Sequence, residues 1–194
     1  MAKTLFIVIA LFMLALGSQT ASHAATEKDI IWHYRSTYNL SAGIAEKRVN
    51  TVIKFIAKSL INGERVSIKR FGLFLSKRKR KTRPVTDGLV LKDIRTRTGL
   101  NHEDARKFLD IFIAQVGLGL KRDNFVKITG FGLFRVKIRP AGPVLMASGK
   151  YKNLPEKARV WFEPSRSLVN AVRTKVLFRA DQVFGEFIIR GKRK

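Results

Sequence analysis

Clusters of lysine and arginine are the residues of this chain whose spacing points to a chemistry. The stretch from Ser76 to Pro84 holds six basic residues in nine positions. The whole chain of 194 residues has 39 Lys and Arg against 14 Asp and Glu, a formal net charge of +25. Folding does not need this excess, which adds self-repulsion, whereas dense positive charge binds polyanions by releasing their counterions. The composition therefore predicts a polyanionic partner, with nucleic acid favoured over an anionic membrane.

Side chains that could carry out catalysis are scattered along the chain. His23 lies in an apolar leader, and His33 and His102 are isolated at expected helix positions. The sequence has no recognisable carboxylate pair, glycine-rich phosphate loop or cluster of metal ligands. The absence of cysteine removes disulfides and thiolate metal sites. We therefore expect a protein that is not an enzyme and that carries no cofactor or metal.

A nine-residue motif occurs twice, as Val66–Phe74 and Val126–Phe134, and it is the element that must position the basic residues. Both copies alternate apolar and polar residues and contain Phe-Gly-Leu-Phe. Alternation is typical of strands, and a glycine between aromatic residues indicates a tight bend or a close backbone approach. Each copy is therefore expected to form a two-stranded hairpin. Its phenylalanines are expected to pack in the core rather than stack on bases: Phe71, Phe74, Phe131 and Phe134.

The duplication continues upstream at a constant offset of sixty residues, without a gap, from about residue 30 to residue 77. Arg35 matches Arg95 and Ile53 matches Ile113. Two helices are expected before each hairpin: a short one over 27–40 or 89–98, then a longer one. The residues expected to cap the longer helices are Ser41 and Asn101. The apolar residues of the first longer helix are expected to face a core: Ile44, Val49, Val52, Ile53, Ile56 and Leu60.

The second copy is followed by segments that the first copy lacks. Residues 135–159 are rich in Pro, Gly and Lys, and a strand over 159–162 follows them. Trp161 is expected to pack beneath the basic segment more readily than to contact a ligand. A helix is then expected, with these residues facing inward: Leu168, Val169, Val172 and Val176. A tail from Asp181 carries an apolar patch and a basic end.

The first 24 residues form a separate leader. Lys3 precedes the apolar run Leu5–Leu16, and Ser22 and Ala24 are small residues where a signal peptidase reads. We expect a cleaved signal peptide, with an uncleaved anchor or a buried helix as alternatives, and no stable membrane insertion after cleavage. The destination stays open between an exported or periplasmic site and an organelle nucleoid of the plastid type.

The order of these segments resembles the bacterial histone-like DNA-binding family of HU and IHF. The strongest match runs from Leu120 to Lys137 and includes Gly130-Phe131-Gly132-Leu133-Phe134. Phe162–Leu168 looks like the family's F-x-P-G-K-x-L, with Ser165 in place of Gly and Arg166 in place of Lys. The resemblance implies an α+β fold in which a helical base carries a saddle of β-hairpins and an extended basic β-arm.

The resemblance divides the chain into four parts: a leader over 1–24, a partial unit over 28–83, a complete unit with its arm over 88–178, and a basic tail over 179–194. Family members are intertwined dimers, so the two units are expected to pair within one chain as a lopsided pseudo-dimer, with a homodimer as the alternative. The first unit is expected to lack an arm, a third strand and a last helix. The tail after Asp181 is expected to fill part of that gap.

The resemblance also implies which residues contact DNA, through a saddle and through an arm that enters the minor groove and kinks the duplex. The saddle candidates are Lys69, Arg70, Lys77, Arg78 and Arg80. The arm candidates are Lys137, Arg139, Lys150, Lys152, Lys157 and Arg159. Arg166 opposes the dipole of the helix that it begins, which a bound phosphate would explain. The family's R-N-P-x-T-G tip is not recognisable, so the candidates for intercalation are Pro143 and Met146.

We interpret the chain as an architectural protein that binds double-stranded DNA with little sequence specificity and bends or compacts it. One alternative is a basic RNA-associated or ribosome-associated protein on the same scaffold. Another is a secreted cationic protein that binds extracellular polyanions. A preference for duplex RNA over nicked DNA would favour the RNA alternative.

Overall fold

The computed structural model describes residues 25–77 and 84–190. The predicted leader, the candidates Arg78 and Arg80, and the basic end of the tail at 191–194 lie outside these residues. The base of the fold is made by four helices: α2 (Glu27–Tyr38), α3 (Ala42–Ile61), α4 (Asp87–Thr98) and α5 (His102–Asp123). None of the helices in the described part of the chain combines the length and apolar content that crossing a membrane requires.

The helix starts follow the sequence closely. The Ser41 hydroxyl accepts a hydrogen bond from the Ile44 amide at 3.4 Å, and the Asn101 side chain accepts one from the Asp104 amide at 2.8 Å, so both predicted caps are confirmed. Ile44 itself was wrongly assigned to the core. It is 48% exposed because it lies in the first turn of α3, before the buried face begins at Ala45.

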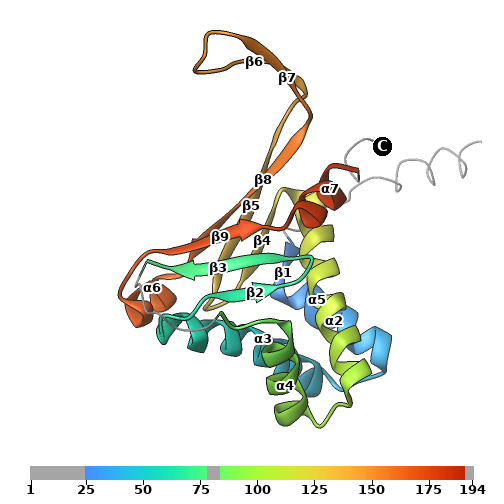
Figure 1. The fold of residues 1–194 in the computed structure, drawn as a ribbon. Coiled ribbons are helices and arrows are strands. Elements are labelled where there is room, and N and C mark those ends of the chain that lie inside the picture. The colour runs from blue at the N-terminus through green and yellow to red at the C-terminus, as the bar shows by residue number, and fades with distance from the viewer. Residues whose placement is uncertain (1–24, 78–83, 191–194) are drawn as a thin grey trace, which may run out of the picture.

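Both predicted hairpins are present and each is part of a separate sheet. One sheet has the order β1-β4-β5-β8 and the other has the order β2-β3-β9. The first contains β1 (Ala25–Thr26), β4 (Phe125–Ile128), β5 (Gly132–Arg139) and β8 (Lys157–Pro164). The second contains β2 (Val66–Ile68), β3 (Gly72–Ser76) and β9 (Val176–Ala180). The strands β8 and β9 lie side by side, so the two sheets together form the saddle above the helices (Figure 1).

The first repeat has a third strand and a last helix, contrary to the sequence-based expectation. The helix expected to run to Val176 is α6 (Arg166–Val172), which ends at Arg173 in a left-handed conformation (φ 54°). The chain then forms β9, which pairs with β3, and the helix α7 (Gln182–Arg190). Val169, expected to face inward, is 37% exposed. The chain forms β9 in place of a longer helix because β3 would otherwise have an unpaired edge, and the apolar strand β9 covers that edge.

The C-terminal segment repeats the end of the second unit at an offset of sixteen residues. Phe178 faces Phe74 across the β3–β9 ladder, as Phe162 faces Phe134 across the β5–β8 ladder. The amide of Asp181 donates to the Phe71 carbonyl at 3.0 Å, and the amide of Ser165 donates to the Phe131 carbonyl at 2.9 Å. The second repeat is thus inserted into the first, between β3 and β9, where an arm would otherwise extend.

The two repeats pair within one chain as a pseudo-dimer. The Asp87 carboxylate at the start of α4 accepts a hydrogen bond from the Lys69 amide in the first hairpin at 2.7 Å. The matching Glu27 carboxylate at the start of α2 accepts one from the Thr129 amide in the second hairpin at 3.0 Å. The last helices also cross over, because α6 packs on α3 and α7 packs on α5 (Figure 1). Each repeat therefore holds the other's hairpin and helix in place.

A single cluster of aromatic rings lies where the repeats meet. The four phenylalanines of the repeated nine-residue motif are buried, as predicted. Contacts cross between the repeats: the ring centroids of Phe71 and Phe134 are 5.7 Å apart, and those of Phe74 and Phe131 are 5.8 Å apart. Because burying one such ring contributes about 1.5–3 kcal/mol, this shared core stabilises both repeats at once.

Candidate nucleic-acid interface

The outward face of the β5–β8 ladder carries most of the predicted arm cations. Side chains alternate across a sheet, and those of β8 are buried and exposed in strict alternation from Lys157 to Glu163. Lys137 lies directly opposite Arg159, and Arg139 lies opposite Lys157. Like charges in opposed positions destabilise a ladder unless an anion lies between them. The arrangement therefore suits a polyanion that runs along this face.

The ladder continues into a single arm that rises from the saddle (Figure 1). Its outer part is formed by β6 (Gly142–Leu145) and β7 (Tyr151–Leu154), which pair antiparallel. The tip is a tight turn in which the Met146 amide donates to the Lys150 carbonyl and the Gly149 amide donates to the Met146 carbonyl, both at 2.9 Å. The predicted phosphate contacts Lys150 and Lys152 are exposed beside it.

The two candidates for intercalation occupy different places on the arm. Met146 begins the turn at the tip and is 41% exposed, whereas Pro143 lies lower on the arm, opposite Asn153. Large apolar side chains surround the tip and are also exposed to solvent: Val144, Leu145 and Tyr151. An exposed apolar tip flanked by lysines has the character of a wedge that can enter a minor groove. Of the two candidates, Met146 lies at the tip and Pro143 lies on β6.

The root of the arm and strand β9 border a groove of about 790 Å³. Trp161 lines it together with Arg159 of β8 and Arg179 of β9. Trp161 was expected to pack beneath the arm, and that expectation was wrong. Its side chain is 43% exposed on the outward face, because the neighbouring Phe162 takes the inward position in the core.

The predicted saddle candidates are spread over several elements. Lys69 and Arg70 are exposed in the turn between β2 and β3, and Lys77 is exposed just after β3. Arg70 has a φ of 64°, so it takes the left-handed conformation that Gly130 has in the second hairpin (φ 70°). Arg166 is exposed as the first residue of α6. The structure thus separates these four residues from the arm set on β5 and β8.

One of the arm candidates, Arg139, forms a hydrogen bond within the protein. Arg139 donates a hydrogen bond from its guanidinium to the Pro155 carbonyl at 2.8 Å, and its Nε is buried without a hydrogen-bond partner. Its side chain is therefore less available to a phosphate than those of Lys137 and Arg159. We assign it a role in holding the two arm strands together at the root of the arm.

Two cations on the outward faces, Arg135 and Arg179, were not predicted as contacts. Arg135 lies opposite Trp161 and forms an exposed ion pair with Glu163 at 3.2 Å. Arg179 of β9 takes the position in the first sheet that Glu163 takes in the second. The signal that could have revealed Arg179 is the sixteen-residue offset between the two C-terminal strands.

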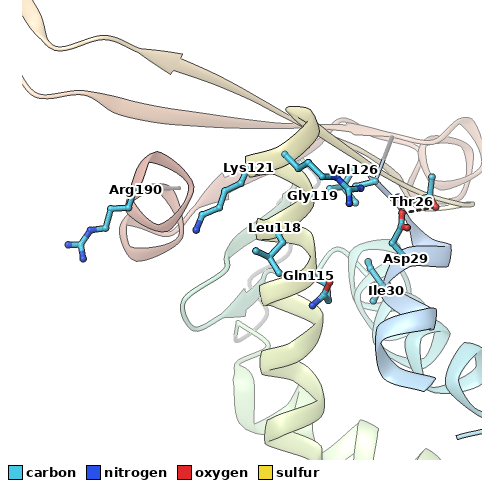
Figure 2. Close-up of a pocket in the computed structure, with 11 residues that line it drawn as sticks. Thr26, Asp29, Ile30, Gln115, Leu118, Gly119, Lys121, Val126 and Arg190 are labelled. Carbon is cyan, nitrogen blue, oxygen red and sulfur yellow. Dashed lines mark hydrogen bonds between the residues drawn. The ribbon is translucent and has the colours of Figure 1, made fainter. Parts of the chain in front are cut away.

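A pocket of about 650 Å³ lies away from the basic face (Figure 2). It is bordered by the start of α2, the end of α5 and Arg190 of α7. Its polar contacts include helix capping, in which Asp29 accepts hydrogen bonds from the Thr26 amide at 2.7 Å and the Thr26 hydroxyl at 3.2 Å, and the Ala25 amide donates to the Asp123 carboxylate at 2.9 Å. In the described part of the chain, no three His, Asp or Glu side chains gather as metal ligands would. We infer that the pocket results from the crossed packing of the repeats.

Comparison with known proteins matches both repeats to one family. The model of the bacterial DNA-binding protein family matches residues 25–88 and again residues 85–173. DNA-binding protein HU of Thermus thermophilus is 29% identical over 90 residues, which are 46% of this chain and 93% of that protein. Integration host factor subunit alpha of Bordetella avium is 38% identical over 47 residues, 24% of this chain and 40% of that protein. The chain therefore belongs to the histone-like bacterial DNA-binding protein family of HU and IHF, as a tandem duplication.

Proposed function

We propose that this protein is a non-enzymatic architectural protein that binds duplex DNA with low sequence specificity and bends it from one side. The observation that carries the proposal is the continuous outward surface from the saddle to the arm tip. Its root holds the opposed cations Lys137, Arg159 and Lys157, and its tip holds Met146 among exposed apolar side chains. Family membership and the HU and IHF relatives support DNA as the polyanion.

The cations on this surface act on phosphates and leave base edges unread. Lysine and arginine on strands release counterions from the backbone, and this supplies affinity without sequence information. Bending a short duplex costs on the order of 1–6 kcal/mol, which the added phosphate contacts of the arm can offset. Met146 at the tip would then lower the cost of bending by wedging between base pairs at one step. Since residues 25–77 and 84–190 contain one arm, the bend lies on one side of the bound site.

Binding of the full chain to a nicked duplex, an intact duplex and a duplex RNA, across a salt series, tests this proposal. We expect steep salt dependence, a preference for the nicked duplex, and a bend that end-labelled duplexes report by energy transfer. Met146→Ala should reduce the bend while Pro143→Ala leaves it nearly unchanged. Equal binding to all three nucleic acids, with no bend, would overturn the proposal.

A further inference from the structure

The helical base carries a second row of cations, on the side of the molecule opposite the arm. On α3 the row runs through Lys47, Lys54 and Lys58, which are spaced by seven and four residues and so share one helix face. Lys92 and Arg97 of the adjacent helix α4 complete it. We call these five residues the base stripe: Lys47, Lys54, Lys58, Lys92 and Arg97. Figure 1 shows α3 and α4 below the sheets, with the arm rising away from them.

Two shallow hollows between α3 and α4 bring these residues together. Lys47, Lys54 and Arg97 line one of about 490 Å³, and Lys58 and Lys92 line the next, of about 340 Å³. The acidic groups that face the stripe are Glu46, Glu64 and Asp93. Asp93 is already paired with Arg97 at 2.8 Å. The four lysines are exposed and form no ion pair with any residue that the structure describes.

The second repeat serves as an internal comparison, because its equivalent helix positions lack most of these five cations. Ala114, Leu118 and Trp32 stand where the base stripe has Lys54, Lys58 and Lys92, sixty residues away. Figure 2 shows Leu118 and Gln115 on this face of α5. Lys107 matches Lys47, but it pairs with Glu103 at 2.7 Å, whereas the first repeat has Gly43 at the position of Glu103.

Three other cations border the second face, Arg190 of α7 among them, and the two on α5 have partners of their own. Lys121 lies 3.3 Å from the centroid of the Phe187 ring, and Arg122 pairs with Asp123 at 2.9 Å. As a whole, α3 has four basic residues and one acidic residue, whereas α5 has four of each. The helices share a fold and a core, so packing does not explain why only α3 concentrates positive charge.

We propose that the base stripe binds the backbone of a second DNA duplex, so that one molecule joins two duplexes. This inference rests on the proposed function, which accounts for the first duplex on the saddle and arm. From Lys47 to Lys58 the row spans about 16 Å of helix, at about 1.5 Å per residue. A duplex presents about one negative charge per 1.7 Å of its axis, so the row faces several phosphates. The second duplex would lie on the far side of the helices from the arm.

The test mixes the full chain with two duplexes, one carrying a donor dye and the other an acceptor. Energy transfer between them reports joining, and a separate titration of one duplex reports binding to the saddle and arm. The double variant Lys54→Ala with Lys58→Leu gives α3 the residue types of α5. We expect this variant to lose at least tenfold in joining while its affinity for a single duplex changes by less than twofold.

The matched control removes two exposed charges elsewhere, by Lys28→Ala with Lys107→Ala, and should leave joining unchanged. The reverse variant, Ala114→Lys with Leu118→Lys, should increase joining. Joining that persists in the Lys54 and Lys58 variant, or a wild-type chain that binds single duplexes without joining them, would overturn this inference alone. A wild-type chain that binds no duplex would overturn the proposed function together with it.

Discussion

Leu75 of β3 and Arg135 of β5 occupy equivalent positions in the two sheets, and both point away from the core. Across the ladder Leu75 faces Leu177, whereas Arg135 faces Trp161. On the inner face the two repeats carry the same phenylalanines, which are buried in both. A shared core requires the inner faces to remain alike, and it leaves the outward faces free to differ. The second repeat thus carries most of the exposed cations of the saddle and the arm, while the outward face of the first is more apolar.

The largest expected effect comes from removing the C-terminal strand and helix that complete the first repeat. Deleting residues 174–194 removes β9 and α7, with buried Phe178, Phe184 and Ile188. Since these side chains belong to the shared core, we expect the cooperative unfolding transition to disappear in both circular dichroism and urea titration. A deletion variant that unfolds in one transition like the wild type would contradict the pseudo-dimer.

Shortening the arm should have the opposite effect from that deletion, because it should leave the fold stable and remove DNA bending. Replacing residues 140–156 by Asn-Gly joins the paired residues Arg139 and Lys157 through a two-residue turn. The arm beyond its root has no part in the core, so we expect the free energy of unfolding to change by about 0.5 kcal/mol or less. DNA bending should be lost. Circular dichroism and energy transfer on end-labelled duplexes measure the two outcomes.

Equivalent core positions in the two repeats should contribute equally to the stability of the protein. Phe74→Ala and Phe134→Ala each remove a fully buried ring and should each lower the free energy of unfolding by about 3–5 kcal/mol. The two rings touch, with centroids 6.2 Å apart, so the double variant should depart from the sum of the single effects. Urea unfolding measures all three. Two separate transitions in either single variant would show that the repeats fold independently.

Exchanging the outward residues should change DNA binding without changing stability. Glu163→Arg copies Arg179 of the first sheet, removes the ion pair with Arg135 and adds a cation beside the groove. We expect tighter binding to a duplex and a steeper salt dependence, by about 0.9 in the logarithmic slope for each added phosphate contact. The reciprocal Arg179→Glu should flatten the slope. An unchanged slope in both variants would remove this face from the contact surface.

The smallest expected effect concerns Trp161. Trp161→Leu copies Leu177, its equivalent in the first sheet, and should weaken binding to a duplex by less than about 1 kcal/mol, as truncation of most interface side chains does. In a Trp32→Phe background the remaining tryptophan is a fluorescence reporter, since the chain has two. We expect its emission to change when a duplex binds. Constant emission at saturation would place the duplex away from β8.

Local patterns in the sequence predicted the parts of the fold that depend on neighbours in the chain. The caps Ser41 and Asn101, the hairpins and the buried phenylalanines all follow from spacing within a few residues. The strand β9 could not be predicted from such spacing. Val176–Ala180 continues an apolar helical pattern from Leu168, and its partner β3 lies far away in the sequence. Periodicity alone does not separate a short buried strand from a helix end.

The sequence predicted which residues belong to the candidate site better than it predicted how these residues are arranged. The arm cations were identified from the resemblance to the family, and the structure brings Lys137, Lys157 and Arg159 to one face. The exposure of Trp161 and the inward bond of Arg139 depend on which face of the sheet meets the core and on how the arm strands pair at the root. The base stripe depends on two helices that meet only after folding.

The insertion of one repeat into the other also has a consequence for the order of events during synthesis. Gly72 of β3 pairs with Ala180 of β9, so β3 has no partner until about a hundred further residues have been synthesised. At about 5–20 residues per second, the ribosome needs on the order of 10 s to supply it. During that interval the second repeat, whose three strands and last helix follow one another in the chain, can form its own ladder first. The repeat that is translated first is thus the last to be completed, and contacts of such long range slow the final step of folding.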